Sequence, residues 1–268
     1  MFKKNVFIPL LILISFVLTS CSITKNDVLP TVTQRPIGVQ QTEKPTSAVN
    51  DINSNSSKIE SSSILTYELT KERYTEADKN IKIEYPQIIN LSDNNKQKTI
   101  NTIIKNEALQ ILKDYKSGNV ELTVLEIGND IKLKSDNILS IQYSGYANFK
   151  NAAHPYHIFF TTNININKSS SIKLMELVNI NKDFLELFRT GKFKSVSPIY
   201  QAGYLENSPN DELIEAFKTA QFYLTKDFLG FSLSVPYAMG DHVEFEIKHQ
   251  DLKDNLKTGN EIWKDLLH

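Results

Sequence analysis

The chain has 268 residues, of which 40% are hydrophobic, and its 30 basic and 31 acidic side chains give a formal net charge of −1. A near-neutral chain of mixed charge lacks the basic surface that nucleic-acid binding requires, so we expect no nucleic acid as a partner. Cysteine occurs once, at Cys21, which excludes an intrachain disulfide or a thiolate metal cluster and leaves stability to an apolar core.

Residues 1–20 have the layout of a secretory signal peptide. Lys3 and Lys4 precede an apolar stretch at residues 6–17, which is shorter than the roughly 20 residues that a membrane span needs. Residues 18–21, Leu-Thr-Ser-Cys, resemble the bacterial lipobox, in which the cysteine thiol is alkylated by diacylglycerol and signal peptidase II cleaves before it. We predict lipidation at Cys21 and a lipid anchor on the outer face of the bacterial cell membrane. The alternative is an ordinary secretory signal with an incidental cysteine.

A polar stretch follows the cysteine. Residues 22–63 consist largely of Ser, Thr, Asn, Gln, Pro and Lys, with isolated Val and Ile and no hydrophobic periodicity. Such a composition cannot bury enough apolar surface to offset the entropy of ordering. We therefore predict that residues 21–63 are the lipidated cysteine and a flexible tether, and that residues 64–268 form one globular domain.

Alternation of apolar and polar residues predicts most of this domain to be strands. One run covers residues 65–69, and a second covers residues 81–85 and is expected to stop at Pro86. Further strands are predicted at residues 120–124, 139–149, 158–166, 229–235 and 243–247. Strands with one buried and one solvated face indicate a mainly antiparallel sheet.

Apolar residues at helical spacing predict the helices. The clearest helix covers residues 100–115, with Ser92 as a plausible N-cap, and a shorter helical stretch is expected at residues 181–188. Ser208 and Pro209 are expected to open another helix as a cap and a first-turn proline. The fold class is therefore α+β, a mainly antiparallel sheet with helices packed on one face.

The most suggestive polar cluster is residues 154–157, His-Pro-Tyr-His, in a predicted turn between two strands. Two imidazoles could bind a metal or a ligand, but two histidines separated by Pro-Tyr do not match the spacing of known zinc sites. The alternative is that these histidines have a structural role in the turn. Asp241, His242 and His249 would join them only if the fold brings them there. We predict no metal and no cofactor. The candidate ligand-binding residues are Tyr146, His154, Tyr156 and His157, since Tyr146 alternates outward and could stack on a sugar or contact a protein.

No arrangement in the sequence predicts catalysis. No serine stands in a Gly-x-Ser-x-Gly elbow, and no glycine-rich phosphate loop occurs. Glu244 and Glu246 could act as an acid–base pair, but strand alternation alone explains both as residues of one solvated face. We therefore predict no catalytic residues.

Three blocks of the sequence resemble the extracytoplasmic domain that is shared by RsiV-type anti-sigma factors and the N-terminal region of PdaC-type peptidoglycan deacetylases. The blocks are residues 83–88 with 101–104, residues 152–156 with 163–168 and 172–177, and residues 222–225 with 236–240, 245–247 and Leu252. In the second block, Asn151 and Ala152 stand where that family usually has two glycines. The resemblance covers about residues 64–267, nearly all of the predicted domain.

This resemblance implies an α+β domain that recognises wall-related ligands, with lysozyme binding known for the anti-sigma member. It does not imply catalysis, because deacetylation belongs to a separate metal-dependent domain. The leading hypothesis is a surface lipoprotein whose non-catalytic domain binds or senses a cell-wall glycan, such as peptidoglycan, or a lysozyme-like protein. The alternatives are a cell-wall hydrolase, or an accessory domain of a wall enzyme, that uses His154 and His157 with a carboxylate, and a scaffold for a membrane protein.

Overall fold

The computed structural model describes residues 66–76, 78, 80–118, 120–197 and 200–267. Cys21, the predicted signal peptide and the predicted tether lie outside the described residues, so these assignments stay predictions. Within the described ranges, no helix is both long and apolar enough to cross a membrane.

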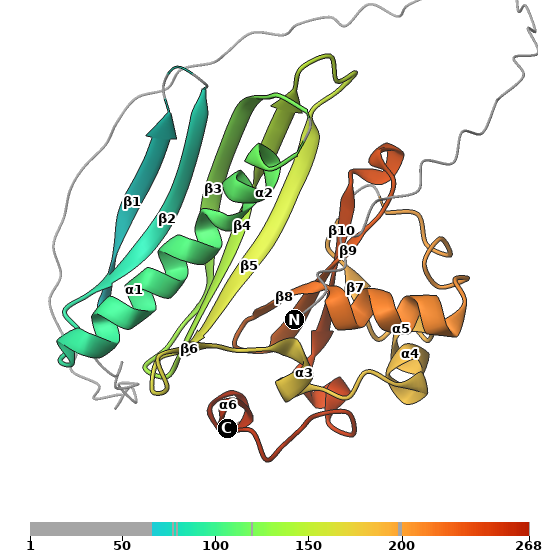
Figure 1. Cartoon of the computed structure of the whole chain (residues 1–268). Coiled ribbons are helices and arrows are strands. Elements are labelled where there is room, and N and C mark those ends of the chain that lie inside the picture. The colour runs from blue at the N-terminus through green and yellow to red at the C-terminus, as the bar shows by residue number, and fades with distance from the viewer. Residues whose placement is uncertain (1–65, 77, 79, 119, 198–199, 268) are drawn as a thin grey trace, which may run out of the picture. The chain divides into compact units, whose positions relative to one another are not determined.

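Most of the N-terminal strands form one six-stranded sheet in the described part of the chain, in the order β1-β2-β3-β4-β5-β6 (Figure 1). Its strands are β1 (Glu68–Glu76), β2 (Ile81–Ile89), β3 (Leu122–Lys134), β4 (Ile138–Phe149), β5 (Tyr156–Asn165) and β6 (Ser170–Ser171). Neighbouring strands are antiparallel except β2 and β3, which are parallel. A parallel pair needs a long crossover, and helices α1 (Asn94–Ala108) and α2 (Gln110–Lys116) form it.

Helix α1 lies along one face of this sheet (Figure 1). Its Ile100 and Ile104 are fully buried in one core cluster with Ile83 of β2, Leu125 of β3 and Ile141 of β4. Burial of each such side chain stabilises the fold by about 1.5–3 kcal/mol. The apolar spacing that predicts the helix is therefore also what fixes it to the sheet.

A four-stranded sheet in the order β7-β10-β9-β8 forms the second part of the domain. Its strands are β7 (Lys194–Ser195), β8 (Gln221–Leu224), β9 (Phe228–Ser234) and β10 (His242–Lys248). Around it lie α3 (Leu174–Leu177), α4 (Lys182–Arg189), α5 (Asn210–Thr219), α6 (Glu261–Leu266) and the 3₁₀ turns η2 (Tyr237–Met239) and η3 (His249–Leu252). Phe184, Phe188, Phe217 and Phe231 pack edge to face in its core at centroid distances of 5.0–5.7 Å.

Buried hydrogen bonds connect the two sheets. Ser140 Oγ of β4 donates to Asn163 Oδ1 at 2.7 Å and accepts from the backbone N–H of Leu224 at 3.0 Å. Asn163 Nδ2 donates in turn to the carbonyl of Phe222 at 2.7 Å. All of these residues are buried, and a buried polar network whose members are all paired fixes one arrangement of the elements that it joins. The β8 strand is thereby fastened to the face of β4 and β5 that is opposite α1.

The α+β class and the dominance of antiparallel pairing are confirmed. The division of the strands between two sheets was not expected from the sequence. The expected stop at Pro86 was wrong, because β2 continues to Ile89. The N–H of Ile88 points away from β1 and donates to Asn101 Oδ1. Pro86 is two residues earlier in the strand, so an N–H at this position would also point away from β1. Proline therefore removes no hydrogen bond between β1 and β2.

Two of the predicted helix caps were also wrong. The side chain of Asp93, and not that of Ser92, caps α1 by accepting from the backbone N–H groups of Asn95 and Lys96. Pro209 occupies the cap position of α5 and makes no side-chain hydrogen bond there, so the proline precedes the first turn instead of lying within it.

Candidate functional site

Tyr146 and His157 lie directly opposite one another on β4 and β5. Both therefore project from the face of the sheet opposite α1, and Tyr146 Oη donates to Glu126 Oε2 at 3.0 Å. Tyr156 is paired with Ala147, whose side chain belongs to the core beneath α1. Successive side chains of a strand point to opposite faces, so the ring of Tyr156 lies on the other side from Tyr146 and His157.

The position of Tyr156 is supported by its electrostatic neighbours. The pKa of Tyr115 in α2 is raised to about 12, chiefly by burial and further by Tyr156 and Asp241. Burial and Asp241 raise the pKa of Tyr156 as well. Tyr156 therefore lies on the α1 side of the sheet, whereas Tyr146 and His157 lie on the other side.

Tyr237 of η2 joins the candidate residues, although the sequence analysis does not place it among them. Its ring stacks on that of His154 with a centroid distance of 3.3 Å and an interplanar angle of 10°. The ring of His157 is nearly parallel to it at 6.4 Å. Tyr237 remains 45% exposed and Tyr146 37% exposed. We call Tyr146, His154, His157 and Tyr237 the aromatic shelf.

A buried carboxylate holds the shelf to the second sheet. Asp241 is only 5% exposed, and its Oδ2 accepts from the backbone N–H of His157 at 2.8 Å and lies 3.1 Å from His157 Nδ1. Gly240 and Asp241 have φ values of 96° and 68°, in the left-handed region that glycine and, among other residues, aspartate adopt most readily. The turn after Tyr237 therefore depends on these two residue types.

The preceding turn uses the same region of backbone space. Asn151 has a φ of 63°, which asparagine tolerates better than most other residues. The replacement of the expected glycine by Asn151 is thus compatible with a left-handed turn ahead of His154.

A shallow groove of about 350 Å³ lies beside the shelf and is lined by Ser144, His157, Ser197, His242 and Glu244. Burial, followed by the charge of His157, lowers the pKa of His242. Glu244 and Glu246 are both half-buried, so the expectation of a solvated face on β10 was wrong. Burial raises the pKa of Glu244. His242 Nε2 lies 3.9 Å from Glu244 Oε1.

The fold brings Asp241 and His242 to the predicted cluster but not His249. His249 is buried against Trp263 at a centroid distance of 5.2 Å, in the core of the second sheet. Across the described ranges, no group of three or more His, Cys, Asp or Glu side chains is arranged to hold a metal ion.

An imidazole oriented by a buried carboxylate is one part of a nucleophilic site. Such a site also needs a nucleophile within about 2.6–3.2 Å of the free ring nitrogen. His157 Nδ1 faces Asp241, and no described hydroxyl forms a hydrogen bond with the other nitrogen. The geometry therefore provides an oriented base and an exposed stacking surface.

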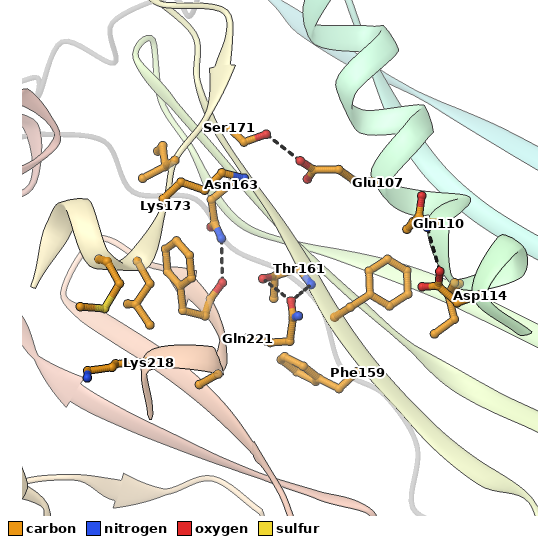
Figure 2. A pocket seen from close by; sticks show the side chains of 17 residues that line it. Glu107, Gln110, Asp114, Phe159, Thr161, Asn163, Ser171, Lys173, Lys218 and Gln221 are labelled. Atoms are coloured by element: carbon orange, nitrogen blue, oxygen red, sulfur yellow. Dashed lines mark hydrogen bonds between the residues drawn. The ribbon is translucent and has the colours of Figure 1, made fainter. Parts of the chain in front are cut away.

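A larger cavity of about 600 Å³ lies along β5 on the side away from β4 (Figure 2). Glu107, Gln110 and Asp114 line it from α1 and α2, whereas Lys218 and Gln221 line it from α5 and β8. Its inner surface includes Phe159, Phe160 and Phe222. No residue in the sequence analysis was assigned to this cavity as a ligand contact, because its walls come from four separate parts of the chain.

No protein-family model and no curated protein matches the chain. It is similar to a solved structure from Bacteroides fragilis described as a member of the DUF3298 family, with a TM-score of 0.50 and 15% identity over 75% of this chain and 97% of that one. A DUF3298 family protein from Pseudomonas aeruginosa gives a TM-score of 0.40 and 12% identity over 71% of this chain and 93% of that one. The Bacteroides fragilis structure shows a shared fold.

Proposed function

We propose that the chain is a lipid-anchored extracytoplasmic protein of a bacterial cell, whose domain binds a cell-wall glycan or a lysozyme-like protein without catalysing a reaction. The observation that carries the proposal is the aromatic shelf. Tyr237 and His154 present stacked, solvent-accessible rings, and Asp241 fixes their support. Rigid aromatic rings provide a large contact area at low entropic cost, and they stack on the apolar faces of sugars.

Binding of the full-length protein to purified peptidoglycan and to lysozyme tests this proposal. We expect the double variant Tyr146→Ala/Tyr237→Ala to weaken binding by at least about tenfold, which corresponds to the 1–2 kcal/mol lost when a binding hot spot is truncated. Tyr204→Ala is the matched control, because Tyr204 is similarly exposed but lies outside the shelf. Failure of the wild-type protein to bind either target would refute the proposal.

The second candidate function is a cell-wall hydrolase, and the pairing of His157 with Asp241 is the observation that favours it. In that case His157 would act as a base on a bound substrate or water. Any wall-degrading activity should then disappear in the double variant His154→Ala/His157→Ala. Activity that is unchanged in this variant would exclude a hydrolase that uses His157 as its base.

A further inference from the structure

The outer edge of β5 has no partner strand over residues 156–161, and we call this stretch the open edge. β4 pairs with β5 along its whole length, but on the other side β6 pairs only with Ile164 and Asn165. Thr161 directs its N–H to this side, where it donates to Gln221 Oε1 at 3.0 Å, and the carbonyl of Asn163 accepts there from Ile172. His157 also directs its N–H to this side, toward Asp241. The side chains of Asp241 and Gln221 thus accept hydrogen bonds at two positions where a carbonyl of a neighbouring strand would otherwise accept.

Phe159 lies midway between these two occupied positions. In an antiparallel strand, alternate residues turn both backbone groups to the same side, so Phe159 directs its N–H and C=O to the open edge together with His157 and Thr161. No hydrogen bond from either group of Phe159 to another described residue is found on that side. An edge with unpaired backbone groups is a template for one more strand.

The cavity along this edge has oppositely charged walls (Figure 2). Glu107 and Asp114 project from α1 and α2, on one side of β5, whereas Lys173 and Lys218 project from the other side. The two carboxylates make hydrogen bonds with the neutral side chains of Ser171 and Gln110. Within the part of the chain that the structure describes, neither carboxylate forms an ion pair, and neither does Lys173. Lys218 pairs with Glu215 of its own helix at 2.7 Å, a contact that is largely exposed to solvent.

We propose that the open edge of β5 binds an extended peptide as an added strand, with basic side chains toward Glu107 and Asp114 and acidic side chains toward Lys173 and Lys218. Successive side chains of an extended peptide point to opposite faces. A peptide in which basic and acidic residues alternate therefore places each charge against the opposite wall. Backbone hydrogen bonds to Phe159 supply affinity, and the two walls supply specificity and register.

The test uses the full-length protein and an acetylated, amidated octapeptide of alternating Lys and Glu. Amide hydrogen exchange is followed by mass spectrometry, and we expect this peptide to slow exchange in the segment that contains Phe159. An octapeptide of the same composition, with four Lys followed by four Glu, should bind at least about tenfold more weakly. Equal binding of the two peptides would overturn the proposal, because it would show attraction between charges without strand pairing.

N-methylation of the peptide separates strand pairing from other modes of binding. Of two alternating peptides methylated at every second residue, the one whose methylated groups face β5 should lose binding and the other should keep it. If both methylated peptides kept their binding, or if both lost it equally, the added strand would be contradicted. If chitin oligosaccharides slowed amide exchange in the segment that contains Phe159 and the alternating peptide did not, the cavity would be assigned to a glycan and the proposal would be overturned.

Asp114→Lys cancels the net negative charge of the wall formed by Glu107 and Asp114 and halves the charge difference between the two walls. We expect it to weaken binding of the alternating peptide by about tenfold. Asp254→Lys is the matched control, since Asp254 is an exposed carboxylate outside the cavity. Should Asp114→Lys fail to fold, Asp114→Asn tests the same charge with a smaller change. Unchanged affinity in the folded variant would overturn the assignment of the acidic wall. None of the substituted residues belongs to the aromatic shelf, and these measurements use neither peptidoglycan nor lysozyme, so their failure is distinguishable from failure of the proposed wall binding.

Discussion

Asp241 should contribute more to stability than an ordinary surface carboxylate, because it accepts from both the backbone and the ring of His157. Hydrogen bonds to charged groups contribute about 1.5–3 kcal/mol. Alanine at the left-handed φ of residue 241 adds a backbone cost of about 1–2 kcal/mol. We therefore expect Asp241→Ala to lower the free energy of unfolding by about 2.5–5 kcal/mol.

Two further variants divide this effect into its causes. Asp241→Asn keeps an acceptor oxygen and tolerates the backbone conformation, so it should cost about 1–1.5 kcal/mol, since charged hydrogen bonds are about twice as strong as neutral ones. His157→Ala keeps the backbone hydrogen bond and removes a ring whose side chain is 52% exposed. It should therefore cost less than about 1 kcal/mol, close to the value for a partly exposed ion pair.

Urea unfolding followed by circular dichroism and by tryptophan fluorescence measures these differences. Trp263 is the sole tryptophan and is buried in the core of the second sheet, so it reports on the part of the fold that contains Asp241. A loss below about 1 kcal/mol in Asp241→Ala would refute the reasoning, as would an Asp241→Asn variant as unstable as Asp241→Ala.

Three other outcomes are expected. A Cβ at Gly230 would lie 2.1 Å from Tyr223 Cζ, so Gly230→Ala should cost at least the 1–3 kcal/mol typical of overpacking, and Tyr223→Ala should relieve this clash in the double variant. Burial lowers the pKa of His242, so the unfolded state binds more protons and stability should fall as the pH drops below about 6.5. Melting temperatures from pH 7.5 to 5.5 should decrease less in His242→Asn, although the raised pKa of Glu244 acts in the opposite direction at lower pH. Cys21→Ala should abolish incorporation of a fatty-acid analogue, and label retained in that variant would contradict lipidation at Cys21.

Local patterns were sufficient to predict most of the individual elements. Residues 139–149 and 243–247 have one apolar and one polar face, and both are strands close to the expected bounds. The strand expected at residues 120–124 is in fact β3, which extends to Lys134. Its second half was not predicted, because most of its side chains are half-buried and alternate weakly. Alternation also shows that one face of a strand is buried, but it does not show which element packs against that face. The division of the strands between two sheets was therefore not anticipated.

The candidate site was predictable only where its residues are close in sequence. Tyr146 and His157 belong to one hairpin, and the hairpin places them opposite each other. Asp241 is 84 residues away from His157, and no spacing rule connects them. The sequence pattern predicts that Tyr156 lies in a turn, whereas β5 begins at this residue. Because the strand includes this residue, the pleat directs the ring of Tyr156 away from that of His157.

The contact between residues 154–157 and residues 236–241 restricts which residue types these two segments can contain. Gly240 and Asp241 adopt left-handed backbone conformations, and Asp241 must also reach the N–H of His157. Few residue types meet both demands, so any chain that uses this contact is restricted to similar residues here. Such a restriction follows from the fold and does not depend on the ligand. The proposed ligand is therefore expected at the parts of Tyr237 and Tyr146 that remain exposed, because the contact between the two segments does not require exposed aromatic surface.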